Sequence, residues 1–465
     1  MAGLFGTLSI ALSGLGVSQQ ELATSSNNVA NANTPGYTRE VAEVAAGAPV
    51  TLGSFNEGTG VVLQKIESLR DPLMEIQLNQ ETQQNSSLNT QLEQLQQMQT
   101  QFSSSTSGIG ADISNFFNSL SQLSPDPSSI ELRQAVLTAA GNLAADFNSA
   151  ANSLGTQKSD LNLTVQQSVG AVNTLTSEIA GVDQQISSLE NANQDATTLV
   201  DQQTSLIRQL SALVDVQVVQ TGQGGIELAT SNGTTLVSGG QSFALTTATG
   251  TDGNTDILAG TTDITGTLTG GSLAGTIQIR DQEIPGVLSQ LDQLAAGFSN
   301  AINTANGLGY ILSDSIPPTL GGNIFTTPPA GGTGAAAAMQ VAITDPTLIA
   351  ASLDGSEGSN GNLANLSAVA TTAVAGNQTP IDAYSDLVFQ VGSQTSNTSA
   401  DVDGSTQILQ QLQDERGSIS GVSLDEEAAN VVQFQTAYQA SARVISTIDS
   451  MLADAVNLGI DTAVQ

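Results

Sequence analysis

The sequence predicts a mainly α-helical, elongated and nested multi-domain protein that carries an inserted β domain. Apolar residues recur at alternating steps of four and three at both ends of the chain, which is the spacing of a coiled-coil seam. No proline occurs between Pro127 and Pro285, so long helices can form there. Within that interval the pattern changes to valines at alternate positions, which is typical of strands.

The two ends, residues 1–37 and 424–465, are predicted to form a terminal helical assembly domain of coiled-coil type. The predicted seam consists of Leu4, Leu8, Leu15, Leu22, Val29, Leu424, Val431, Phe434, Tyr438, Ile445, Ile448 and Leu452. Glu21 is the only charged residue before Arg39. Such a helix is poorly solvated, which favours docking of the two ends on each other or on a neighbouring copy. For either end alone, an ordinary amphipathic helix on a globular core is the alternative.

A turn motif ends the first helix. Its residues are Asn31, Asn33, Pro35, Gly36 and Tyr37. Asparagine tolerates left-handed backbone, and Pro-Gly is a turn signal, so the stop has a local cause. The following glycine-rich stretch to about residue 70 is predicted to be extended.

Residues 38–213 and 285–423 are predicted to form a helical rod domain. Within it, residues 306–360 are expected to be irregular because they are rich in Gly, Pro and Ala. The apolar spacing predicts helices over about 72–104, 128–155, 161–214 and 380–418.

Residues 214–284 are predicted to form an inserted β-rich outer domain. Valines alternate from position 214, and Asn232-Gly233 is a strong hairpin signal. Gly-, Thr- and Asp-rich turns continue to about residue 281, and a helix is expected from about residue 285.

Composition excludes several classes of function. The chain has 465 residues with 9 basic and 43 acidic side chains, a net charge of −34, and neither Cys nor His. Zinc fingers, haem sites, iron–sulfur clusters and Ser-His-Asp or Cys-His catalytic centres are therefore excluded. The negative charge repels nucleic acids and anionic membranes, and no stretch approaches the roughly 20 apolar residues of a membrane span. We therefore expect that the chain is not an enzyme and that it binds no cofactor, no nucleic acid and no membrane.

Two short motifs superficially suggest ligand binding. Gly332-Thr-Gly334 is a loose match to a dinucleotide loop, but it follows prolines rather than a strand. Asp252, Asn254 and Asp256 place oxygens at alternate positions, as calcium loops do, but Ile257 stands where the sharp turn needs glycine. We interpret the second motif as an acidic hairpin loop.

Several segments resemble bacterial flagellar axial proteins. Residues 27–37, Asn-Asn-Val-Ala-Asn-Ala-Asn-Thr-Pro-Gly-Tyr, resemble the signature of rod, hook and hook-associated subunits. Other segments resemble the flagellar hook-associated protein 1 family, the hook–filament junction proteins. They are Gly270-Gly-Ser-Leu-Ala-Gly275, Asn232-Gly-Thr-Thr-Leu-Val237 and, most specifically, Ser418-Ile-Ser-Gly-Val-Ser-Leu-Asp-Glu-Glu427 followed by Phe434-Gln-Thr-Ala-Tyr438.

The resemblance implies a structural subunit that self-assembles at the hook tip and joins hook to filament. It implies as partners further copies of itself, the hook protein, the next hook-associated protein, and a type III export chaperone on the C-terminal helix. It also implies a place in the extracellular flagellum after a transient stay in the cytoplasm. The alternatives are another axial protein, such as hook-associated protein 3 or a flagellin-like chain, and a secreted coiled-coil adhesin.

Overall fold

The computed structural model describes residues 2–34, 36–52, 55–102, 108–192, 194–220 and 225–461. The chain divides into two compact units. Unit 1 comprises Met1–Gln83, Ala171–Leu245 and Thr406–Gln465. Unit 2 comprises Gln84–Gly170 and Thr246–Ser405. Among the helices formed by these described ranges, none has the length and apolarity that spanning a membrane requires.

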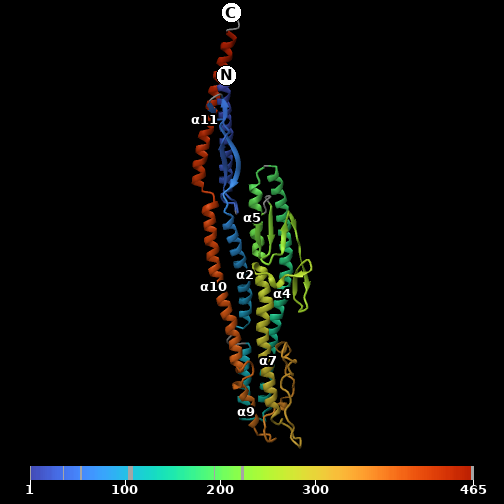
Figure 1. Ribbon diagram of the computed structural model, residues 1–465. Helices are drawn as coiled ribbons and strands as arrows, with labels where there is room; N and C mark the ends of the chain where they lie inside the picture. Colours follow the sequence, from blue (N-terminus) through green and yellow to red (C-terminus); the bar gives the residue numbers. More distant parts are fainter. Residues whose placement is uncertain are drawn as a thin grey trace. The chain divides into compact units, whose positions relative to one another are not determined.

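The chain ends meet in unit 1. Helices α1 (Ala2–Asn31) and α11 (Leu424–Asp461) pack side by side (Figure 1). Strands β1 (Glu40–Ala46) and β4 (Val61–Ser68) form an antiparallel hairpin that packs on α1. The short strands β2 (Val50–Leu52) and β3 (Phe55–Glu57) pair within the connection of that hairpin. The hairpin therefore places both of its long strands beside the terminal helices.

The remainder of unit 1 packs helices against a four-stranded antiparallel sheet. Its strands lie in the order β5 (Gln217–Gln220), β6 (Ile226–Ala229), β7 (Thr235–Ser238) and β8 (Gln241–Ser242). Helix α5 (Thr197–Leu213) precedes the sheet. Leu228, Leu236 and Val237 on the strands and Leu210 on α5 are fully buried, so burial of these side chains holds the sheet on its helices.

Unit 2 is mainly helical. It contains α3 (Ile109–Leu123), α6 (Gly271–Gln278), α7 (Ile284–Gly307), α8 (Ala335–Ala338) and α9 (Gly361–Ala368). Helices α2 (Pro72–Phe102), α4 (Ile130–Asn191) and α10 (Pro380–Ser420) contribute residues to both units. The small sheet has the order β11 (Thr262–Asp263), β10 (Thr255–Ala259), β9 (Leu245–Thr249).

Four phenylalanines form the centre of the unit 2 core. Phe116 packs edge-to-face on Phe298 with ring centroids 5.7 Å apart, and Phe117 and Phe325 complete the cluster. Four of the chain's 11 Phe therefore lie in this one core. Edge-to-face geometry adds to the burial of the rings.

The predicted class, mainly α with an inserted β region, is confirmed. The predicted hairpin turn is also confirmed, because Gly233 adopts a φ of +87° between β6 and β7. Predicted helix boundaries were wrong in two regions of the chain. The predicted helices over 128–155 and 161–214 are instead one helix of 62 residues, α4, followed by a break and α5. Asn191 is the last residue of α4, and Asp195 lies in the break; both residue types favour caps and turns over helix interiors.

The other wrong boundary concerns the helix expected from about residue 285. Helix begins at Gly271 and continues through a π-helical turn, Ile279–Glu283, into α7. In that turn the N–H of Ile284 donates to the carbonyl of Ile279. The wider turn accommodates Pro285, which has no N–H to donate, so the proline does not mark a helix start. The boundaries of the three predicted domains remain predictions.

Candidate assembly surface of the terminal helices

Helices α1 and α11 run antiparallel, because the N-terminal end of α1 and the C-terminal end of α11 lie at the same end of the pair (Figure 1). A small residue keeps them close: a Cβ added at Gly14 would lie 3.4 Å from the Oγ of Ser441. Beside this contact, Thr7, Ile10 and Val444 help to line a groove of about 450 Å³ between the two helices and β4. The surface of the helix pair is therefore grooved at this point.

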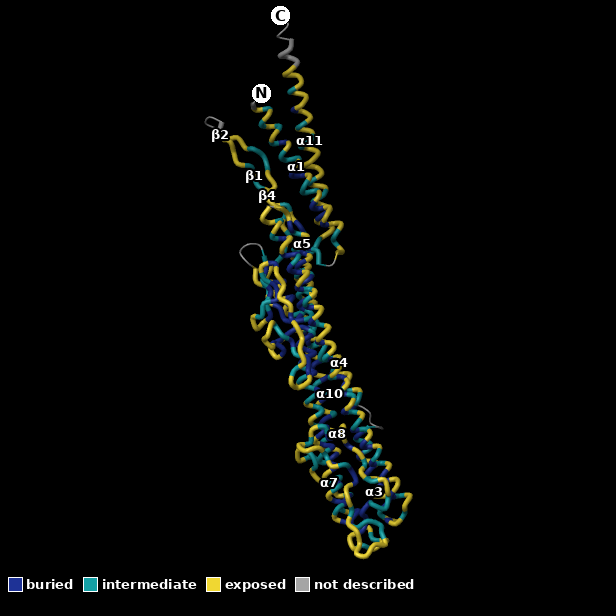
Figure 2. The backbone as a smooth tube through the Cα atoms, turned by 90° about the vertical axis from the view of Figure 1, so that its right-hand side faces the viewer, coloured by how far each residue is buried: buried dark blue, intermediate teal, exposed yellow. Residues whose placement is uncertain are grey.

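The predicted seam residues differ in exposure. Ile448 is buried at 4% exposure. The half-buried members are Leu4, Leu8, Leu15, Leu22, Val431, Phe434, Ile445 and Leu452. Val29, Leu424 and Tyr438 are exposed at 42%, 53% and 37%. One chain thus covers its own seam only in part, as the intermediate and exposed colours of α1 and α11 indicate (Figure 2).

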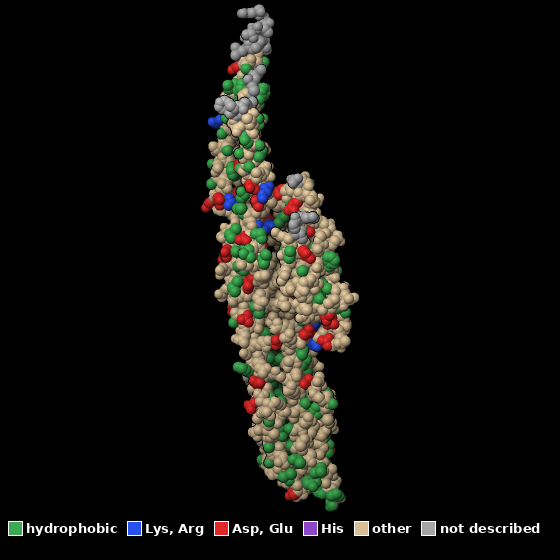
Figure 3. Space-filling model, in the orientation of Figure 1, with side chains coloured by type: hydrophobic (Ala, Val, Ile, Leu, Met, Phe, Trp, Pro, Cys, Tyr) green, Lys and Arg blue, Asp and Glu red, His purple; other side chains and the backbone are tan. Residues whose placement is uncertain are grey.

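A second set of apolar residues on the same helices was not predicted. Phe5, Leu12, Val432, Val444, Met451 and Val456 are 42% to 62% exposed. Apolar side chains are visible along the terminal pair in Figure 3. Phe5 and Leu12 are seven residues apart, as are Val444 and Met451, so a second heptad phase could have revealed them. Contiguous apolar patches are typical of interaction sites, so these residues are further candidates for the assembly surface.

The turn motif is held by an asparagine that sequence reasoning did not select. Asn28 is 1% exposed; its Nδ2 donates to the Glu40 carbonyl at 2.8 Å, and its Oδ1 accepts from the Glu40 N–H at 2.9 Å. The Tyr37 hydroxyl donates to the same Oδ1 at 2.9 Å. Asn28 therefore fastens the end of α1 to the start of β1.

Of the predicted motif residues, Tyr37 takes part in this contact, and the others contribute less to holding the turn. Asn31 donates to the carbonyl of Asn27 at 3.1 Å and accepts from the Thr34 hydroxyl. Asn33 is exposed, and Gly36 supplies the predicted positive φ, +85°. Pro35 lies outside the described residues.

Four of the nine basic side chains gather in unit 1 near the start of α11, forming an arginine cluster (Figure 3). Arg39 binds Glu427 at 2.7 Å and Glu426 at 3.1 Å. Arg70 binds Asp201. Glu75 of α2 accepts from Arg208 of α5 at 2.8 Å and from Arg416 of α10 at 2.5 Å. These ion pairs lie near the start of α11 and join segments that are distant in the sequence.

Electrostatics in this cluster favour the charged pairs and a neutral tyrosine. Burial alone would raise the pKa of Glu75, but the hydrogen bonds and charges of Arg416 and Arg208 outweigh it and lower that pKa. Burial, with the charges of Glu40, Asp201 and Glu427, raises the pKa of Tyr37. The Tyr37 hydroxyl therefore stays protonated and can donate to Asn28.

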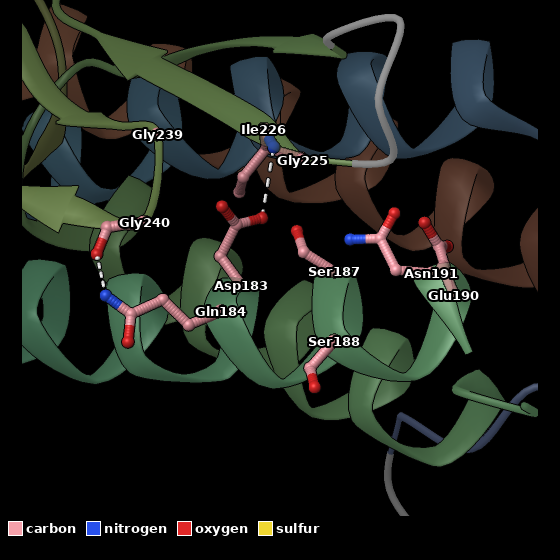
Figure 4. A pocket seen from close by; sticks show the side chains of 10 residues that line it. All are labelled: Asp183, Gln184, Ser187, Ser188, Glu190, Asn191, Gly225, Ile226, Gly239 and Gly240. Atoms are coloured by element: carbon pink, nitrogen blue, oxygen red, sulfur yellow. Dashed lines mark hydrogen bonds between the residues drawn. The ribbon is translucent and has the colours of Figure 1, made fainter.

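A polar cavity of about 840 Å³ in unit 1 lies between the end of α4 and the sheet (Figure 4). Asp183 and Gln184 project from α4 toward the sheet backbone. The Asp183 carboxylate accepts from the Ile226 N–H at 3.0 Å and from Gln203 at 3.1 Å, and Gln184 donates to the Gly240 carbonyl at 2.7 Å. These groups are occupied in holding the sheet.

The two short motifs also have structural roles. Both carboxylate oxygens of Asp292 accept from the loop, from the N–H of Gly334 at 2.7 Å and of Ala336 at 2.9 Å. The chain's own carboxylate therefore fills the anion position of this glycine-rich loop. Asp252 accepts from the N–H of Asn254 at 3.0 Å within the β9–β10 turn. In the described part of the chain, no three metal-ligating residues are grouped so that they could hold an ion.

Comparison with known proteins matches three family models to this chain. Residues 95–325 match the flagellar hook-associated protein FlgK helical domain. Residues 8–38 match the flagella basal body rod protein, and residues 417–458 match the flagellar basal body rod FlgEFG protein C-terminal region. The two rod models thus fall on α1 and α11, the helices of the candidate surface.

Whole-length relatives agree with these models. The chain is 29% identical to flagellar hook-associated protein 1 of Bacillus subtilis, over 98% of this chain and 99% of the relative. It is 27% identical to the protein of the same name from Escherichia coli, over 96% and 98%. The flagellar hook junction protein FlgK from Burkholderia pseudomallei shares the fold, with a TM-score of 0.67 at 19% identity, covering 74% of this chain and all of that structure.

Proposed function

We propose that this chain, which belongs to the flagellar hook-associated protein 1 family and is a structural protein of the extracellular flagellum, self-assembles at the hook tip and joins hook to filament. The observation that carries the proposal is the incompletely covered surface of α1 and α11. The rod-protein models match these same helices.

The proposed partners follow from that surface and the family. Further copies of the chain, the hook protein and the next hook-associated protein pack on the terminal helices. A type III export chaperone holds α11 while the chain is still in the cytoplasm. Seam residues left half-buried in one chain gain burial in each of these complexes, which is the driving force for association.

The proposed domain roles follow the predicted boundaries. Residues 1–37 and 424–465 assemble, residues 38–213 and 285–423 form the rod, and residues 214–284 form the outer domain. The chain has no catalytic role in this proposal. Similarity over nearly the whole chain supports this function over a hook-associated protein 3 or flagellin-like role and over an adhesin.

Charged substitutions in the seam test the proposal. Leu15→Asp and Ile445→Asp place a carboxylate in a half-buried apolar seam, which costs several kcal/mol unless the charge is relieved. In a strain that lacks the chain, we expect either variant to be exported but to leave hooks without filaments. Far-UV circular dichroism of the purified variants should show that most of the helix is retained.

The matched control is Leu163→Asp on α4, because Leu163 is 56% exposed and lies outside the terminal helices. We expect this variant to assemble normally. Normal filament formation by both seam variants would contradict the proposed role of α1 and α11.

A further inference from the structure

Most basic side chains of this chain already bind polar partners within the chain. Six of the nine form ion pairs: Arg39, Lys65, Arg70, Arg208, Arg280 and Arg416. Arg133 donates instead to the carbonyls of Pro127 and Ile349, both at 2.6 Å. Within the described part of the chain, no carboxylate lies within 4.0 Å of Lys158 or Arg443. Arg443 is exposed, and it is the only basic residue of α11.

The other terminal helix, α1, carries a single charge, and that charge is negative. Glu21 is the only charged residue of α1. It is half-buried, and no basic group in the described ranges lies within 4.0 Å of it. Burial raises the pKa of this carboxyl, as expected for a partly desolvated acid without a counter-charge.

These two charges cannot meet within one chain. Gly14 of α1 lies opposite Ser441 of α11, and the helices run antiparallel. Glu21 lies seven residues beyond Gly14, and Arg443 lies two residues beyond Ser441 in the opposite direction along the pair. Their Cα levels therefore differ by about 14 Å at a rise of 1.5 Å per residue. Two extended side chains do not bridge that offset across the helix pair.

We propose that Glu21 of one copy pairs with Arg443 of a neighbouring copy and thereby sets the axial register of the terminal helices. The inference rests on the proposed function, because it requires copies of the chain packed through α1 and α11. A neighbour displaced along the pair by about 14 Å brings the two charges to one level. The contact is heterologous, so it can repeat from copy to copy around a ring or helix.

Charge complementarity identifies a second copy as the partner. Helix α1 has no Lys or Arg, so an ion pair between terminal helices of different type must join Glu21 to Arg443. The apolar stripes alone specify register weakly, because a shift of one heptad preserves their pattern. An ion pair at one fixed position of this surface penalises each wrong register by leaving two charges unpaired.

Charge reversal tests this pair. Glu21→Arg, Arg443→Glu and the double exchange are expressed in a strain that lacks the chain, and the fraction of hooks that bear filaments is counted by electron microscopy. We expect each single reversal to reduce that fraction about tenfold or more, because it places like charges together. The double exchange should restore it to near the unmodified level. A monomer that failed to fold would not be rescued in this way.

Two further variants distinguish the proposed contact from other pairings. Asp449→Arg reverses an exposed charge on α11 and should leave filament formation unchanged. If Arg443 instead pairs with a neighbouring α11, Arg443→Asp would be rescued by Asp449→Arg, and that result would overturn the proposal. So would single reversals that behave like the unmodified chain, or a double exchange no better than its worse parent.

The location of the unmodified chain separates this inference from the function on which it rests. If the unmodified chain is found at the hook–filament boundary while the charge reversals do not change the fraction of hooks that bear filaments, only the Glu21–Arg443 pair is refuted. If the unmodified chain is absent from that boundary, the proposed function itself fails.

Discussion

Glu75 is the residue on which the arginine cluster depends most. Its carboxylate is about 10% exposed and binds guanidinium groups from two other helices. Glu75→Gln leaves Arg208 and Arg416 partly buried without a counter-charge. Breaking a buried pair on one side costs about 3 to 5 kcal/mol, and we expect a loss near the lower end because Arg208 is 27% exposed. Urea unfolding at neutral pH measures this loss.

Lys65 supplies the matched control for that measurement. It also bridges two carboxylates, Glu43 at 3.6 Å and Glu67 at 3.1 Å, but all three side chains are at least half exposed. Solvent and salt screen such pairs. Lys65→Gln should leave the urea midpoint unchanged, and a loss equal to that of Glu75→Gln would show that burial does not govern these pairs.

The same carboxylate predicts an acid-sensitive stability. The pKa of Glu75 in the fold lies below its ordinary value of 4.5, so its contribution is complete above about pH 4.5 and is lost as pH falls through the lowered value. The free energy of unfolding should therefore fall more steeply below pH 4.5 in the unmodified chain than in Glu75→Gln. Urea titrations at several pH values test this, and parallel curves would contradict it.

Residue contacts of this kind were not predictable from spacing. Glu75 and Arg416 are 341 positions apart, and no local pattern joins them. The turn motif was visible because it is local, yet Asn28 was missed because its partner, Glu40, lies beyond the turn. By contrast, the positive φ of Gly36 follows directly from the Pro-Gly signal.

At the scale of elements, α7 offers a direct test of close packing in unit 2. A Cβ at Gly297 would lie 1.9 Å from the carbonyl oxygen of Val374, whereas a Cβ at Gly286 of the same helix meets nothing within 4 Å. Gly297→Ala must displace backbone, so we expect a loss of about 1 to 3 kcal/mol. Gly286→Ala should be neutral or stabilising by up to about 1 kcal/mol, since alanine favours helix. Thermal unfolding of both variants checks the contrast, and equal shifts would refute it.

Helices with strong local signals were predictable. The predicted range 72–104 became α2, which starts at Pro72, and 380–418 became α10, which starts at Pro380. Proline suits a helix start because its missing N–H has no partner there. The same rule misled at Pro285, where the π turn lets helix continue from Gly271. Tertiary packing favours helix before Pro285. Helix α6 lies so close to α2 that a Cβ at Gly275 would be 2.4 Å from the Ser87 carbonyl oxygen.

At the scale of the whole molecule, the matched seams at the two ends indicated that the termini belong together, and α1 and α11 do pack on each other. What spacing along the chain did not reveal is that residues 171–245 share unit 1 with both ends. That grouping depends on contacts of the sheet and α5 with segments near the termini, such as the ion pair of Arg70 with Asp201. Long-range pairs of this kind leave no periodic trace in the sequence.

The most direct measurement is the position of the chain on intact flagella. An epitope inserted at Gly253, in the exposed turn between β9 and β10, allows immunogold labelling of purified flagella without altering α1 or α11. A subunit that joins hook to filament should be labelled only at the hook–filament boundary. Label along the filament, or flagella without label, would contradict the proposed function.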